Sequence, residues 1–141
     1  MLELIIVAII ISILATIGFA QYSNMIERSR IVEAIQRIGL MRQLTYEYYL
    51  KNGNKLNNMQ PSDVGLPNLS PVCTSESFYA YHMMPLNPSG VALAAERCIG
   101  YGKPPDASRK YTYYQYYYPA TGQNEWHCYY DNDGGCFGLT P

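Results

Sequence analysis

The side chains of this chain that could do chemistry are few: four cysteines, two histidines and one isolated glutamate near the N-terminus. The cysteines are Cys73, Cys98, Cys128 and Cys136. Because no C-x-x-C spacing occurs among them, zinc binding is disfavoured and two structural disulfides are expected. Three pairings are possible, and we favour the two sequential ones, Cys73–Cys98 and Cys128–Cys136. Such disulfides would stabilise a small domain in an oxidising compartment.

The sequence around the histidines and aspartates favours neither catalysis nor a metal site. His82 falls in an expected strand, and His127 stands beside Cys128. No serine, cysteine or carboxylate near either histidine completes a catalytic set, so we expect no enzyme activity and no cofactor. Asp131 and Asp133 resemble half of a calcium-binding loop. The bidentate glutamate of an EF-hand is absent, and we favour a solvated turn over a calcium site.

Glu3 is the only charged side chain before Glu27. A carboxylate costs roughly 2.5–3.5 kcal/mol at the centre of a bilayer and less near its interface. A simple membrane anchor has no use for such a group. We therefore interpret Glu3 as a carboxylate that pairs with a cation on a neighbouring subunit, with an incidental interfacial charge as the alternative.

A long helix must position Glu3. The segment Leu4–Ala20 has no charged residue and reaches the short limit for a membrane-spanning helix. Beyond Glu27 the apolar residues recur with a period of 3.6 and form one stripe. This stripe comprises Ile31, Ala34, Ile35, Ile38, Met41, Thr45 and Tyr48. Because no proline occurs in residues 1–60, we predict one helix from about Leu2 to about Asn52, on the order of 75 Å long.

The remaining sequence predicts a connector over residues 54–72 and then a small sheet. Alternating residues and turn signals predict strands over Phe78–Met84, Val91–Cys98, Tyr111–Tyr118 and Trp126–Tyr130. Short turns between consecutive strands favour an antiparallel meander that covers the helix stripe with one face. The predicted class is α+β, a long helix packed by about four antiparallel strands with disulfides. Its parts are an apolar helix (1–26), an amphipathic helix (27–53) and a sheet domain (54–141).

Two sets of side chains are candidates for contacts with other subunits. Val32, Leu40, Leu44 and Leu50 lie off the helix stripe and are available for contacts with other copies. The chain has 15 tyrosines against 3 phenylalanines and 1 tryptophan. We interpret Tyr111–Tyr118 as a strand with aromatic rings on both faces, one packed on the helix and one on a neighbouring subunit.

A surface-binding or sugar-binding role for this strand is the alternative, and aromatic charge transport along a filament is a third. The side chains concerned are Tyr113, Tyr114, Tyr116, Tyr117 and Tyr118. Nucleic-acid binding is not indicated, because the formal net charge is −1. No lysine or arginine precedes the apolar run, which is not typical of a secretory signal peptide.

The N-terminal segment resembles the type IV pilin family, whose members have a short apolar motif ending in glutamate and then an uninterrupted apolar helix. Leu2-Glu3-Leu4, the run Ile5–Ile10 and Ala15-Thr16-Ile17 match this pattern, and Gln21-Tyr22 fits the segment that follows. The stretch Tyr48–Gly53 is similar to the helix end of many bacterial pilins and pseudopilins.

The chain departs from the family at three places. Family members usually begin with a methylated phenylalanine two residues before the position of Met1. They commonly have glycine where this chain has Ser12 and proline where it has Ala20. Gly18 is the one remaining helix-weakening residue between those positions.

The resemblance implies a subunit that waits in the inner membrane and is extracted by an assembly platform with a separate ATPase. Identical subunits would then form an extracellular filament on the bacterial surface, used for example in adhesion or motility. Glu3 would pair with a neighbour's N-terminal amine. Residues expected to pack in the filament core are Leu4, Ile5, Ile6, Val7, Ile9, Ile10, Ile13, Leu14, Ile17 and Phe19. The alternatives are a major pseudopilin of type II secretion and a membrane-anchored binding module with a tyrosine-rich face.

Overall fold

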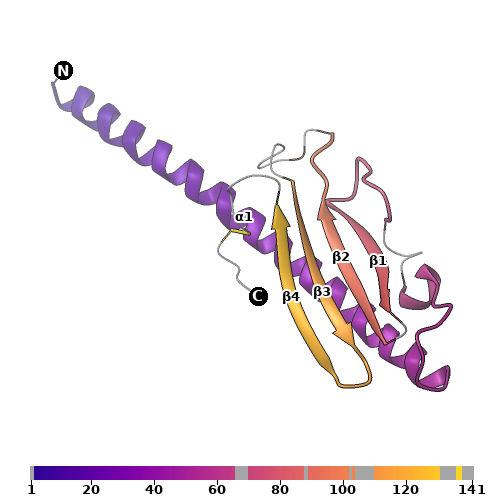
Figure 1. The fold of residues 1–141 in the computed structure, drawn as a ribbon. Coiled ribbons are helices and arrows are strands. Elements are labelled where there is room, and N and C mark those ends of the chain that lie inside the picture. Colours follow the sequence, from indigo (N-terminus) through magenta and orange to yellow (C-terminus); the bar gives the residue numbers. More distant parts are fainter. Residues whose placement is uncertain are drawn as a thin grey trace.

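The computed structural model describes residues 2–65, 70–87, 89–101, 103, 110–130 and 136–137. One long helix, a short 3₁₀ helix and a four-stranded sheet follow one another along the chain (Figure 1). Their bounds are α1 Leu2–Lys51, η1 Pro61–Val64, β1 Tyr79–Asn87, β2 Gly90–Arg97, β3 Tyr111–Tyr118 and β4 Gln123–Tyr130. The predicted α+β class is confirmed.

Helix α1 is continuous over 50 residues and ends within one residue of the predicted position. Gly53 has a φ of +65°, the left-handed conformation that ends many helices and that glycine adopts without steric cost. The backbone N–H of Asn54 donates to the carbonyl of Tyr49 at 2.9 Å, so it satisfies one of the last helical carbonyls. The helix is also continuous through Gly18.

The four strands form the predicted antiparallel meander, in the order β1-β2-β3-β4. β3 has the predicted bounds, and the other strands differ from the prediction by up to three residues at an end. Between β2 and β3, the ring of Tyr118 lies over Gly90. A Cβ atom at position 90 would lie 2.6 Å from the Tyr118 Cε1 atom, so only glycine leaves room for this ring.

One face of the sheet packs on the second half of α1, so the domain has two layers (Figure 1). The helix contributes the predicted stripe, of which Ile35 and Tyr48 are only partly buried. Alternate residues of β3 face this stripe, since its burial alternates along the strand. The stripe positions with no exposed surface are Ile31, Ala34, Ile38, Met41 and Thr45. The four apolar ones among them form one core with Val91, Leu93 and Ala95 of β2.

Two sets of contacts show how the helix is oriented along the strands. Glu27 contacts Arg97 at the end of β2 and Tyr111 at the start of β3. Nearer the end of the helix, Arg42 lines a cavity together with Tyr117. The β2 end at Arg97 and the β3 end at Tyr111 therefore lie closest to the apolar half of α1.

The connector contains more structure than the sequence predicted. The 3₁₀ helix η1 buries Val64 completely, and Leu56 is also in the core. Asp63 caps η1 by accepting a hydrogen bond from the Gln60 backbone N–H at 2.7 Å. The Cδ1 atom of Leu44 lies 2.9 Å from where a Cβ atom on Gly65 would stand. Leu44 is thus packed against the connector and, unlike Val32, Leu40 and Leu50, is not spare surface.

Both predicted disulfides are present. Cys73 pairs with Cys98 just after β2, and Cys128 of β4 pairs with Cys136. Because all four cysteines are paired, none is available as a metal ligand. One disulfide fixes the segment before β1 to the end of β2, and the other fixes the segment after β4 to that strand.

We expect the two disulfides to stabilise the sheet domain unequally. The pairs close loops of 25 and 8 residues, for which loop-closure entropy gives about 3.5 and about 2.5 kcal/mol respectively. The double variant C73A/C98A should therefore lose more unfolding free energy than C128A/C136A. Chemical denaturation in detergent, followed by the emission of Trp126, measures both losses. A larger loss in C128A/C136A would contradict this ranking.

Candidate functional site

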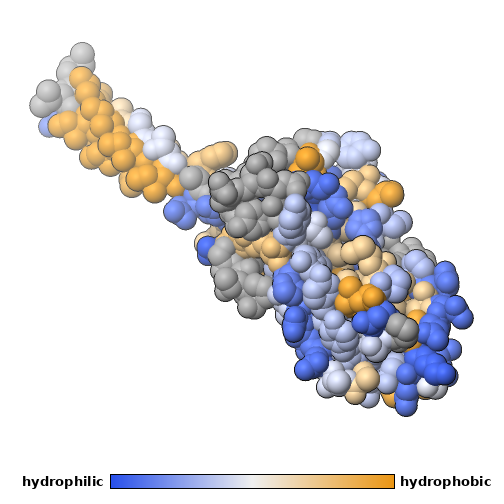
Figure 2. All heavy atoms as spheres, viewed as in Figure 1, coloured by the Kyte–Doolittle hydropathy of each residue, from blue (hydrophilic) through white to orange (hydrophobic). Residues whose placement is uncertain are grey.

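The first half of α1 projects from the domain with its apolar side chains in contact with nothing else in the described structure (Figure 2). The most apolar 18-residue window has a mean hydropathy of 2.6 and none of it is buried. By length and composition this helix can cross a membrane. All residues predicted to pack in a filament core are exposed: Leu4, Ile5, Ile6, Val7, Ile9, Ile10, Ile13, Leu14, Ile17 and Phe19.

The polar side chains within this apolar half make hydrogen bonds to their own helix. The Ser12 hydroxyl donates to the Ala8 carbonyl at 2.7 Å, and the Thr16 hydroxyl donates to the Ile13 carbonyl at 2.8 Å. Neither hydroxyl therefore requires water, and both are compatible with lipid or with packed protein around them.

Glu3 lies in the first turn of α1 and its side chain is exposed. The helix dipole favours a negative charge at this end, typically by 0.3–1 kcal/mol at an exposed site. Within the described residues, no ion pair joins Glu3 to a cation. A carboxylate in this position can accept a cation from another molecule.

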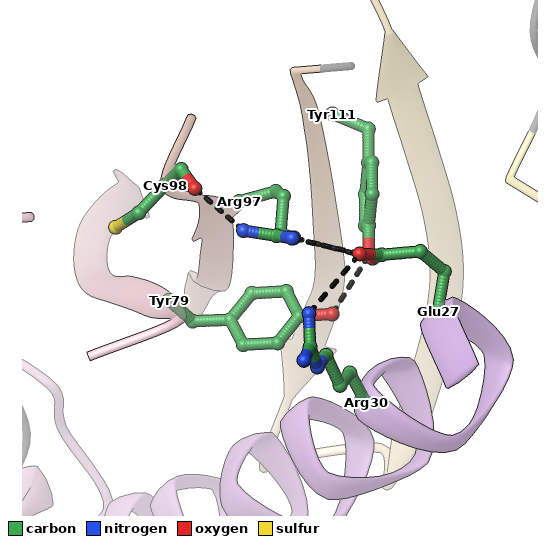
Figure 3. A network of polar contacts seen from close by, with 6 residues as sticks. All are labelled: Glu27, Arg30, Tyr79, Arg97, Cys98 and Tyr111. Carbon is green, nitrogen blue, oxygen red and sulfur yellow. Dashed lines mark hydrogen bonds and ion pairs between the residues drawn. The ribbon is translucent and has the colours of Figure 1, made fainter. Parts of the chain in front are cut away.

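A buried ion pair marks the point at which the exposed half of α1 meets the sheet. Glu27 and Arg97 are each 1% exposed, and Arg97 donates to both carboxylate oxygens (Figure 3). The distances are 2.7 Å from Nη2 to Oε1 and 3.2 Å from Nε to Oε2. This bidentate geometry is the strong form of an arginine–carboxylate interaction.

Four further residues complete the network around Glu27 and Arg97. The Tyr111 hydroxyl donates to Oε2 at 3.1 Å, and Arg30 lies 3.4 Å from Oε1. The hydroxyls of Tyr79 and Tyr111 are 2.7 Å apart, and Arg97 also donates to the Cys98 carbonyl at 2.5 Å (Figure 3). A buried charge is tolerated only when it is paired and hydrogen-bonded, and this network meets that condition.

The network also determines the ionisation of its members. Burial lowers the pKa of the Arg97 guanidinium, but the hydrogen bonds and the charge of Glu27 outweigh it, and the net pKa is raised. Burial raises the pKa of Tyr111 and of Tyr79, and the negative charge of Glu27 adds to both shifts. Arg97 is therefore charged and both phenols are neutral at physiological pH.

A second set of contacts joins the sheet domain to the same part of the helix. The guanidinium of Arg30 lies 3.8 Å from the centre of the Phe78 ring, and the Lys103 ammonium lies 5.1 Å from it. Lys103 also donates to the Ser75 carbonyl at 2.9 Å, and Arg28 donates to the Phe137 carbonyl at 2.6 Å. Segments next to both disulfides are thus fixed to the helix between residues 27 and 30.

The sequence interpretation missed the ion pair between Glu27 and Arg97. One signal was present: Glu27 stands four residues before Ile31 and so falls on the buried stripe. A carboxylate on such a stripe requires a buried cation as partner. The identity of that partner could not be predicted, because Arg97 is 70 residues away in sequence.

The tyrosines of β3 divide between the two faces of the sheet. Tyr113 and Tyr117 are 3% and 7% exposed and belong to the core, so their assignment as surface-binding aromatics was wrong. Strand alternation determines this outcome, because odd-numbered residues of β3 face the helix. Tyr114, Tyr116 and Tyr118 lie on the other face.

The outer face carries an aromatic cluster. The rings of Tyr114 and His127 are 5.3 Å apart and inclined by only 20°, and Tyr116 lies 5.0 Å from His127. No group of three or more histidine, cysteine or acidic residues in the described part of the chain could hold a metal ion. The calcium candidates Asp131 and Asp133 fall outside the described residues.

Comparisons with known proteins add no family to this description. No protein-family model, no curated protein and no solved structure matches the chain.

We expect the loss of one partner of the buried ion pair to lower the unfolding free energy more than the replacement of both partners does. Either single variant, E27Q or R97M, leaves a buried group without its partner and should lower the unfolding free energy by about 3–5 kcal/mol. The double variant E27L/R97M replaces both charges and should recover most of that loss. Denaturation in detergent measures all three. Additive losses in the double variant would show that the two side chains do not act as a pair.

We expect the domain to lose stability in alkali. An unfolded tyrosine loses its proton near pH 10, whereas burial raises the pKa of folded Tyr81 to about 12 and that of Tyr111 further. Above about pH 10 the folded state thus binds more protons, and its stability falls by up to about 1.4 kcal/mol per pH unit for each such tyrosine. Denaturation between pH 9 and 11.5 measures this slope.

The variant Y111F should show a smaller slope than the unmodified chain, because one of the shifted phenols is gone. The matched control is Y129F, which removes a hydroxyl from a ring that is 62% exposed. An unchanged slope in Y111F would contradict the assignment of the alkaline loss to the buried network.

Proposed function

We propose that the chain is a structural subunit of a type IV pilus-like extracellular filament that polymerises through its N-terminal helix. The observation that carries this proposal is the exposed apolar half of α1, which is continuous with a half that is packed by a disulfide-bonded sheet. The sequence resemblance between this segment and type IV pilins supports the same function.

A helix that is apolar on every face must be surrounded by lipid or by protein. Before assembly the bilayer would surround it, and in a filament the helices of identical subunits would replace the lipid. This exchange alters the surroundings of the apolar side chains and keeps them out of water.

Glu3 fixes the register of each subunit relative to its neighbour during this exchange. Its carboxylate lies at the tip of the helix, and within the described structure no ion pair forms with it. In a filament it would pair with the N-terminal amine of a neighbouring subunit, which neutralises a charge that is costly in apolar surroundings. The resemblance also implies an inner-membrane assembly platform and an ATPase as partners, and a final location on the cell surface.

A membrane-anchored binding module is the second candidate function. The cluster of Tyr114, Tyr116 and His127 on the outer sheet face favours it, because partly exposed aromatic rings suit contacts with sugars and other surfaces. Such a module would act as a monomer in the membrane. A type II secretion pseudopilin would share the fold and form short periplasmic polymers, which distinguishes it from a surface filament.

Material sheared from the surface of cells that express the chain tests the proposal. We expect long helical fibres by electron microscopy, with this chain identified in them by mass spectrometry. In E3A, fibre yield should be lost or sharply reduced while the protein still inserts into the membrane. The matched control is E33A, which removes a carboxylate that pairs with Arg37 at 3.3 Å on the exposed surface of the globular half.

The outcomes separate the candidates. Normal fibre yield from E3A would remove the pairing role of Glu3. A chain that stays monomeric in the membrane and binds glycans would favour the binding module. Short polymers confined to the periplasm would favour the pseudopilin.

A further inference from the structure

Exposed tyrosines gather at the level where the apolar helix meets the sheet. Tyr22, Tyr101 and Tyr129 are 62%, 70% and 62% exposed, which makes them the most exposed tyrosines in the described part of the chain. Tyr129 is opposite Thr112, next to the β3 residue that contacts Glu27. Tyr22 is on α1 itself, five residues before Glu27.

Tyr101 is held in an unfavourable backbone conformation. Its φ is +65°, a left-handed value that is a genuine outlier for a bulky side chain. Gly100 and Gly102 flank it in the sequence, and a glycine would adopt this conformation without steric cost. Strain of this kind tends to be kept at functional sites, and here it accompanies an aromatic ring directed into solvent.

A chain of contacts ties Tyr101 to the same level of the helix. The Lys103 ammonium lies 5.9 Å from the Tyr101 ring and 5.1 Å from the Phe78 ring. Phe78 in turn lies 3.8 Å from the guanidinium of Arg30 on α1. The three exposed tyrosines therefore lie near the level of helix residues 22–30, with Tyr129 on the sheet face that points away from the helix.

The length of the apolar segment places this level at a membrane surface. Residues 4–25 span about 33 Å at 1.5 Å per residue. The hydrocarbon core of a bilayer is about 30 Å thick. If this segment crosses a bilayer, Glu27 and Arg30 lie at the headgroups, and so do the tyrosines beside them. Tyrosine is enriched at such interfaces because its ring is apolar and its hydroxyl is polar.

The helix segment at this level has a positive net charge, with Arg28 and Arg30 against Glu27. Glu27 is the only acidic residue in the segment 22–30, and it is shared between Arg30 and Arg97. Arg28 adds a further cation and is exposed. Lysines and arginines near a membrane surface are attracted to anionic headgroups by about 1 kcal/mol each.

We propose that Tyr22, Tyr101, Tyr129 and Arg28 form a membrane-contact surface that holds the sheet domain against anionic phospholipid headgroups before assembly. This inference rests on the proposed function, because it requires the apolar half of α1 to lie in a bilayer. The surface orients the domain on the membrane through its exposed rings and its positive charge.

Tryptophan probes in the full chain test this surface. Y101W places a probe on it, Y46W places one on an exposed site near the other end of the helix, and L14W places one in the apolar half. Trp126 is common to all variants and gives the background. Each variant is reconstituted into phosphatidylcholine vesicles, with and without phosphatidylglycerol. The vesicles contain lipids labelled with a quencher either at the headgroup or on the acyl chain.

We expect the headgroup quencher to remove most of the Y101W probe emission and little of the Y46W probe emission. The Y101W quenching should increase with phosphatidylglycerol, and 1 M NaCl should reverse that increase, because the Debye length is then about 3 Å. The acyl-chain quencher should act on L14W.

Three results would overturn the proposal, and they are distinguishable. The first result is quenching of L14W by the acyl-chain label together with equal and weak headgroup quenching of Y101W and Y46W. It would refute the contact surface but not the insertion of the helix into the membrane. Absence of L14W quenching would remove the contact surface together with the membrane-resident stage of the proposed function. Y101W quenching that does not respond to phosphatidylglycerol would remove the role of anionic lipid.

Discussion

Half of a 50-residue helix is apolar on all sides and cannot remain in water. The other half resolves the same problem within the chain, because a four-stranded sheet covers its apolar stripe. The two halves form one uninterrupted element, so the covered half fixes the direction in which the uncovered half projects (Figure 1).

The buried ion pair between Glu27 and Arg97 stands at the boundary between these halves. It occupies a position on the helix stripe where an apolar residue would have extended the core. Buried ion pairs often add little net stability but make one arrangement specific, since a misplaced charge is costly. Here the pair joins the helix to the ends of β2 and β3, and contacts next to both disulfides reinforce the same level. The junction is consequently suited to keep the domain in one orientation relative to the projecting helix.

Local sequence patterns were sufficient for most of the fold. The 3.6-residue period and the absence of proline predicted the helix to within one residue. Turn signals and alternation predicted all four strands, and the sequential disulfides were the pairs observed. The connector was underestimated because it adds few apolar residues to the core: Val64 of the single 3₁₀ turn, and Leu56 before that turn.

Prediction failed where the answer depended on contacts between distant segments. Alternation predicted that β3 would have two aromatic faces, but which tyrosines are buried depends on how the strand meets the helix, and Tyr113 and Tyr117 were misassigned for that reason. The ionic network joins residues of α1, β1, β2 and β3, so no single segment contains its signature. The candidate site on the apolar helix, by contrast, was evident from the sequence, because local hydropathy alone identifies a segment that is apolar on every side.

The central claim is that the apolar half of α1 leaves water by packing against copies of itself. Helical reconstruction of sheared fibres by electron cryomicroscopy tests this directly. We expect rod-shaped density for residues 4–25 of every subunit around the fibre axis, with the sheets forming the outer surface. Fibres whose interior contains the sheets, with the apolar helices facing solvent or absent from the axis, would contradict it.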